Sequence, residues 1–230
     1  MANINIYESI NALITSEIVS EISASFKEDS TNIRLASESA IAGLLFSIPP
    51  KEGSSEVETA IRKAGTSYPY IRSKFTDIFT GKADETTYYL GFRFLESLFG
   101  NRVNTFTSLI SHKSGLSIRN TDKLLSMISP VVAAYLGNII LTEKTSFATL
   151  LREIENEKDS YQNFIPSQLS ELLEISGIGT SEQLPFSIDI NNPTNIPSEQ
   201  LKIKRGFDLG KWITILIAIA VLIFWWRSCI

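Results

Sequence analysis

Histidine and cysteine, the residues that most often carry acid–base, nucleophilic or metal chemistry, occur once each in this sequence, as His112 and Cys229. One histidine excludes a two-histidine metal site such as HExxH, and one cysteine excludes a cysteine-based zinc cluster or an internal disulfide. A Ser-His-Asp triad would have to use His112, and no GxSxG motif accompanies it. His112, next to Lys113 and close to Gly115, is therefore expected to be an exposed turn residue.

Two further patterns resemble chemical sites only weakly. The Gly-Ile-Gly run at 177–179 resembles part of a phosphate-binding loop, but it lacks a preceding strand, a third glycine and a Walker lysine. A helix C-cap and turn is expected there instead. Three glutamates share residues 152–158 with one arginine and one lysine, which is typical of a solvated helix face. We therefore expect no catalytic, cofactor-binding or metal-binding residue, no cofactor and no enzymatic activity.

Composition is that of a folded protein and not of a nucleic-acid binder. Of the 230 residues, 43% are hydrophobic and 20% are charged, which is ordinary for a globular chain. The formal net charge of -4 supplies no basic field for phosphate, so no nucleic-acid partner is expected. The first residues have no basic stretch followed by an apolar run, and we expect no secretory signal.

Any functional side chain must be positioned by helices. Apolar residues recur at three- and four-residue steps, and no stretch alternates with the two-residue period of a half-buried strand. We therefore expect an all-α, multi-helix globular domain over residues 1–178. The pattern predicts helices near residues 4–26, 32–48, 54–79, 86–99, 103–113, 120–141, 146–157 and 160–176.

Several residues are expected to cap or interrupt these helices. Gly65 and Pro69 are expected to bend or split the third helix, and a kink or a restart is expected at Pro130. Asn120 or Thr121 is expected to cap the helix that contains Pro130.

Four phenylalanines, Phe92, Phe94, Phe99 and Phe106, are expected to belong to the core, because their spacing fits one buried stripe. The alternative is that they form a groove for an amphipathic partner helix.

The chain after residue 178 changes character. Residues 179–206 are rich in proline and asparagine and are predicted to be a linker. Residues 207–230 are predicted to be a basic flank and one C-terminal transmembrane helix. Its apolar run reaches about 23 Å, and flanking residues extend it towards the bilayer's hydrocarbon thickness of about 30 Å. A buried core helix is the alternative.

The ends of this run carry the residues expected to anchor the chain in a lipid bilayer: Lys211, Trp212, Trp225, Trp226 and Arg227. Indole rings suit the membrane interface, and the cations can reach the headgroups. More cations precede the run than follow it, which places the preceding domain in the cytoplasm. In that orientation Cys229 would face the periplasm, either as a passive interfacial residue or as a bridge between two copies.

Three segments carry a family resemblance. They are Leu98-Phe99-Gly100, the run from Ile110 to Ser117, and the run from Leu124 to Gly137 that contains Pro130. They are similar to the DUF937 family, a bacterial helical domain that includes YidB-like proteins. The resemblance covers about residues 5–178, with Phe164 to Ser167 and Leu172-Leu173 resembling the closing segment. These are packing motifs, so no catalytic residue carries over.

The resemblance implies a setting for the protein. Some bacterial relatives place such a domain before one membrane helix and a periplasmic OmpA-like, peptidoglycan-binding domain. This sequence departs from that arrangement by ending at Ile230. The expected location is the bacterial inner (cytoplasmic) membrane, as a single-pass protein with its N-terminal domain in the cytoplasm.

The expected function is that of a membrane-anchored, non-catalytic interaction or scaffold protein that binds a protein partner or itself. One alternative is an enzyme with an unrecognised helical active site, which a deep pocket with perturbed carboxylates near Arg93 or Arg102 would favour. Another is the N-terminal part of an OmpA-like envelope protein that links the inner membrane to the cell wall.

Overall fold

The computed structural model describes residues 5–49 and 54–174. The chain divides between Thr180 and Ser181, and the described residues all belong to the first part. They contain helices and no strand, which confirms the all-α prediction for this domain. The α-helices are α1 (Ile6–Leu13), α2 (Ser16–Phe26), α3 (Ser30–Ser47), α4 (Ser55–Thr66), α5 (Tyr68–Ser73), α6 (Phe75–Phe79), α7 (Glu85–Phe99), α8 (Val103–Ser114), α9 (Ile118–Thr142), α10 (Phe147–Asn156), α11 (Lys158–Tyr161) and α12 (Leu169–Glu174).

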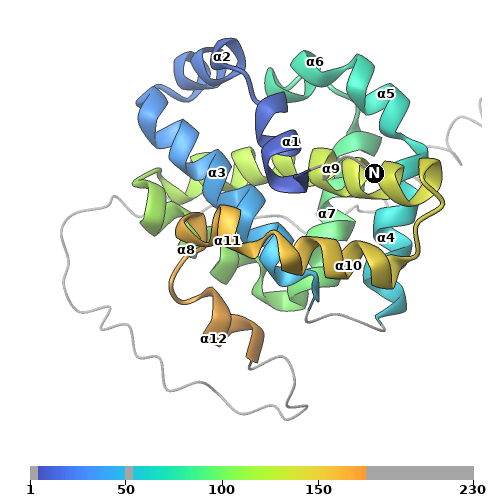
Figure 1. Cartoon of the computed structure of the whole chain (residues 1–230). Helices are drawn as coiled ribbons and strands as arrows, with labels where there is room; N and C mark the ends of the chain where they lie inside the picture. Colours follow the sequence, from blue (N-terminus) through green and yellow to red (C-terminus); the bar gives the residue numbers. More distant parts are fainter. Residues whose placement is uncertain (1–4, 50–53, 175–230) are drawn as a thin grey trace, which may run out of the picture. The chain divides into compact units, whose positions relative to one another are not determined.

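Helix α9 forms the centre of the domain, and Figure 1 shows it crossing the middle of the helical body. It packs most extensively against α4 and α7, and also contacts α3 and α8. Among the described residues, α9 alone has the length and composition to cross a membrane, with a mean hydropathy of 1.9. Its apolar window is 78% buried inside the protein, so α9 is a core helix covered on most sides.

Glycines let α9 approach its neighbours unusually closely. A Cβ atom added to Gly137 would lie 2.1 Å from the Ile61 carbonyl oxygen and 2.6 Å from the Gly65 Cα atom on α4. A Cβ atom added to Gly91 on α7 would lie 2.4 Å from the Pro130 Cδ atom. Both helix crossings therefore require glycine, because a side chain at Gly137 or Gly91 would clash with the neighbouring helix. Helix α9 continues through Pro130, so the predicted restart there is wrong.

Polar caps place helix ends at positions that periodicity did not indicate. The predicted helix over residues 4–26 is broken in two, because the Thr15 side chain accepts a hydrogen bond from the Ile18 N–H and starts α2. The cap of α9 is Ser117 and not Asn120 or Thr121, since Ser117 Oγ accepts from the Asn120 N–H at 3.2 Å.

Glycine and proline breaks agree better with the sequence. The predicted third helix is divided into α4, α5 and α6, with breaks at Ser67 and Lys74. Gly100 ends α7 with φ of 57°, a positive value that glycine adopts readily. The predicted last helix is interrupted before Pro166 and becomes α11, a 3-10 turn over Gln162–Phe164, and α12.

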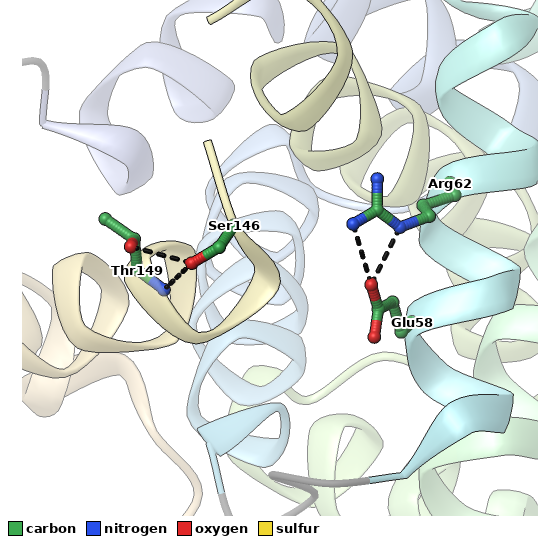
Figure 2. Close-up of polar contacts among 4 residues, drawn as sticks. All are labelled: Glu58, Arg62, Ser146 and Thr149. Carbon is green, nitrogen blue, oxygen red and sulfur yellow. Dashed lines mark hydrogen bonds and ion pairs between the residues drawn. The ribbon is translucent and has the colours of Figure 1, made fainter. Parts of the chain in front are cut away.

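Local polar contacts stabilise α10 and α4. Figure 2 shows Ser146 Oγ accepting from the Thr149 N–H at 3.1 Å, which caps the start of α10. On α4, Glu58 Oε1 lies 2.7 Å from Arg62 Nη2, an i,i+4 ion pair on one face of the helix.

The predicted linker over residues 179–206 and the predicted anchor lie outside the described residues. The same holds for Lys211, Trp212, Trp225, Trp226, Arg227 and Cys229, and for the turn at 177–179. These assignments stay predictions.

Candidate interaction surface on helix α7

The residues first considered for chemistry do not come together. His112 is exposed, as predicted, but it lies in the last turn of α8 and not in a turn between helices. Glu153 and Glu155 are exposed on α10, which confirms the solvated face there. In the described part of the chain, no group of three or more histidine, cysteine, aspartate or glutamate side chains is placed to hold a metal ion.

Glu157 departs from the prediction of a solvated face, because it is partly buried against the start of α1. Its Oε2 atom accepts hydrogen bonds from the Ile6 N–H at 2.6 Å and the Tyr7 N–H at 3.4 Å. The carboxylate thus satisfies backbone donors at the helix N-terminus, 151 residues away in sequence from Ile6. Burial raises the pKa of this carboxyl above its ordinary value of 4.5, against the lowering effect of the two hydrogen bonds, and Glu153 and Glu8 add repulsion.

The Glu157→Gln variant is expected to become more stable relative to the wild type as the pH rises. A carboxyl with a higher pKa in the folded than in the unfolded protein disfavours folding once the pH exceeds its unfolded value of 4.5. Glutamine keeps an acceptor oxygen for the Ile6 N–H but carries no charge. Urea unfolding of both full-length proteins from about pH 4 to about pH 7 measures the difference. If the free energy of unfolding of the variant, relative to that of the wild type, fell as the pH rises, the assignment would be contradicted.

Three of the four singled-out phenylalanines are core residues, as predicted. Phe94, Phe99 and Phe106 are buried, and the rings of Phe99 and Phe106 stack with their centroids 4.2 Å apart. Phe92 is the exception, since 52% of it is exposed on the outer side of α7. The prediction that all four share one buried stripe is therefore wrong for Phe92.

Phe92 belongs to a set that we call the α7 face, formed by the exposed residues Glu85, Tyr89, Phe92 and Arg93 and the partly exposed Glu96. Tyr89 precedes Phe92 by one helical turn and is equally exposed, at 52%. Arg93 forms an ion pair with Glu96 on the same helix. The opposite side of α7 is buried against the core through Leu90, Gly91, Phe94, Leu95 and Leu98. The α7 face therefore combines two large aromatic rings with charges of both signs.

A groove of about 550 Å³ lies beside this face, between α4 and α7. Its charged lining residues are Glu56 and Lys63 from α4, and Arg93 and Glu96 from α7. The two carboxyl groups whose pKa is raised by burial, Glu38 and Glu157, are not among the residues that line it. The groove thus lies next to Arg93, but without the perturbed carboxylates that were expected of a catalytic pocket.

The helices and the α7 face define an all-α domain that packs around one apolar helix and exposes a mixed aromatic and charged surface. Residues 8–138 match the family described as "Bacterial protein of unknown function (DUF937)", and the chain belongs to this family. The predicted resemblance is therefore confirmed over that range, which ends in α9. The segments at 164–167 and 172–173 lie beyond it. No curated protein and no solved structure matches the chain.

The motifs that carried the resemblance are explained by packing and backbone geometry. Gly100 and Gly115 end α7 and α8 with positive φ angles of 57° and 76°. Pro130 and Gly137 lie at the two close crossings of α9 with α7 and α4. None of these residues is part of the α7 face, so the motifs are explained by the fold and do not indicate the candidate site.

Proposed function

We propose that this protein is a membrane-anchored, non-catalytic interaction protein whose helical domain binds a protein partner through the α7 face. The observation that carries the proposal is the pair of exposed aromatic rings, Tyr89 and Phe92, on one side of α7. Large aromatic side chains dominate binding energy at protein interfaces, and charged residues around them add specificity. Arg93 and Glu96 supply such charges.

The anchor is the second part of the proposal. The apolar run bounded by Lys211, Trp212, Trp225, Trp226 and Arg227 supports a single C-terminal span in the bacterial inner membrane. The cations before the run support a cytoplasmic helical domain. A tethered domain has a high effective concentration at the membrane surface, so a surface of modest size can still recruit a partner.

Changing both aromatic residues tests this function. The full chain that carries Tyr89→Ala and Phe92→Ala is expected to recover its partner at least about tenfold less well, because truncating hot-spot side chains typically costs more than about 1 kcal/mol each. Its stability is expected to stay within about 0.5 kcal/mol of the wild type for each exposed position. The measurement is mild crosslinking in cells, followed by detergent pull-down and quantitative mass spectrometry.

The matched control is Ile118→Ala, which removes another large exposed apolar side chain, from α9 and outside the α7 face. It is expected to retain the partner. Equal recovery by the double variant and the wild type would contradict the proposed surface. Turnover of a small molecule by the full chain would overturn the non-catalytic assignment and favour an enzyme.

A further inference from the structure

We propose that the partner of the α7 face is a second copy of this chain, with the two α7 helices packed antiparallel about a two-fold axis at Tyr89. This inference rests on the proposed function of the same surface and names its partner. In the described chain, α7 is the helix that exposes the most aromatic side chain, since Tyr89 and Phe92 are both 52% exposed. The charges around Tyr89 determine which partner fits.

The charges around Tyr89 are complementary to themselves. Glu85 precedes Tyr89 by four residues and Arg93 follows it by four, so all three lie on one side of the helix. In an antiparallel pair with its two-fold axis at Tyr89, each position before the axis meets the equivalent position after it on the other copy. Arg93 of each copy therefore meets Glu85 of the other, and the symmetry forms this pair twice.

A second charge pair follows the same rule further from the axis. Lys82 and Glu96 stand seven residues before and after Tyr89, again with opposite charges. Lys82 lies in the turn before Asp84, which caps α7. Lys82 and Glu96 are therefore matched only by their equal separation from Tyr89 along the helix axis. Apart from Asp84, whose side chain caps α7, the order along the chain is thus a positive residue, a negative residue, Tyr89, a positive residue and a negative residue. A parallel pairing would place like charges together, which is unfavourable.

The aromatic residues fill the centre of the same arrangement. Tyr89 lies at the axis and meets Tyr89 of the second copy, a pair suited to offset or edge-to-face contact. Phe92 comes three residues after the axis, where Thr86 of the second copy lies opposite it. Thr86 is small and exposed, so it leaves room for the ring. The Tyr89–Tyr89 contact and the two symmetry-related Phe92–Thr86 contacts, flanked by charge pairs, give a centre and rim like those of known interfaces.

The size of this surface predicts weak association. One face of a single helix is at the low end of interface sizes, below about 1,200 Å² in total, where complexes are typically transient. A dimer would therefore depend on high local concentration, which the proposed membrane anchor would supply.

Charge reversal on separate chains tests both the partner and its register. Full chains with Glu85→Arg or Arg93→Glu are each expected to self-associate at least about tenfold more weakly than the wild type, because each homodimer would face like charges twice. An equimolar mixture is expected to regain association as a heterodimer, since the new arginine on one chain then faces the new glutamate on the other. Sedimentation in mild detergent from about 10 µM to about 1 mM, with differently tagged chains, measures this.

Two controls separate dimerisation from folding. Circular dichroism of each variant is expected to match the wild type. Glu85→Arg leaves the Arg93–Glu96 ion pair on the same helix intact, whereas Arg93→Glu removes it. Equal weakening by both variants therefore assigns the loss to contact between copies and not to the loss of this internal pair.

The outcomes distinguish this inference from the proposed function. A wild-type chain that stays monomeric throughout, while a different protein is captured and then lost in the double alanine variant, would overturn the dimer and leave the interaction function standing. Self-association that is equally strong in the wild type and in both charge-reversed variants would overturn the proposed dimer, because the contact between copies would not use the Arg93–Glu85 pair. If the double alanine variant also recovered every partner as well as the wild type does, the proposed function of the α7 face would be overturned as well.

Discussion

Replacing Gly137 with alanine is expected to lower the free energy of unfolding by about 3 kcal/mol. The added Cβ atom would lie 2.1 Å from the Ile61 carbonyl oxygen and 2.6 Å from the Gly65 Cα atom. Both neighbours are backbone atoms of α4, so no side-chain rotation can relieve the clash, and α4 and α9 have to separate. This separation would disturb the most extensive helix contact in the domain.

The matched control for this substitution is Asn138→Ala at the next position of α9. Asn138 is only partly buried, and the change from asparagine to alanine favours a helix. Urea unfolding of the full chain, followed by circular dichroism, measures both variants. Helix propensity alone would make Gly137→Ala more stable by about 1 kcal/mol. A gain of that size would show that α4 and α9 do not pack as closely as described.

The Phe106→Ala variant is expected to lose about 4 kcal/mol of stability, which is typical of a large aromatic residue truncated in a core. Phe106 is 0% exposed and its ring stacks on Phe99. It also fills the space beside Gly43, where an added Cβ atom would lie 2.8 Å from the ring. The substitution would therefore leave a cavity between α3, α7 and α8.

The Phe92→Ala variant makes the same change at an exposed position of α7. It is expected to alter stability by about 0.5 kcal/mol or less, because surface substitutions away from special features have small effects. Thermal and urea unfolding of the two full-length variants give the comparison. Similar losses in both would contradict the assignment of Phe106 to the core and of Phe92 to the surface.

Periodicity was enough to predict an all-α domain and most of its helices, because buried residues at three- and four-residue steps dominate the pattern. It failed at the break between α1 and α2, where Ile10, Ile14 and Ile18 continue one apolar stripe across the break. The break depends on the Thr15 cap, and a threonine inside an apolar pattern gives little sign of this role. Ser117, which caps α9, was missed for the same reason.

Contacts between distant parts of the chain could not be predicted from one sequence. Gly65 and Pro69 were expected to bend or split a helix, and the break falls at Ser67 between them, but the sequence did not indicate that Gly65 also lies against Gly137. Glu157 was predicted to be part of a charged, solvated face, but its partners are the Ile6 and Tyr7 N–H groups, which lie far from it in sequence. Only the tertiary arrangement brings these residues together.

The candidate surface could be predicted in part from the sequence. Phe92 was grouped with Phe94, Phe99 and Phe106 because their spacing was expected to fit one buried stripe. A helical projection of α7 separates Phe92 from Phe94, since Tyr89 and Phe92 fall on the side opposite Leu90 and Phe94. The sequence could therefore indicate two exposed aromatic residues on this helix, whereas the neighbouring groove required the packing of α4.

The buried position of α9 has a consequence for biosynthesis. A helix of 25 residues with this hydropathy resembles a membrane signal when it leaves the ribosome uncovered. Its main packing partners, α3, α4, α7 and α8, all precede it in the chain. They have therefore emerged before α9 is complete, and the nascent domain can enclose this helix before the targeting machinery captures it.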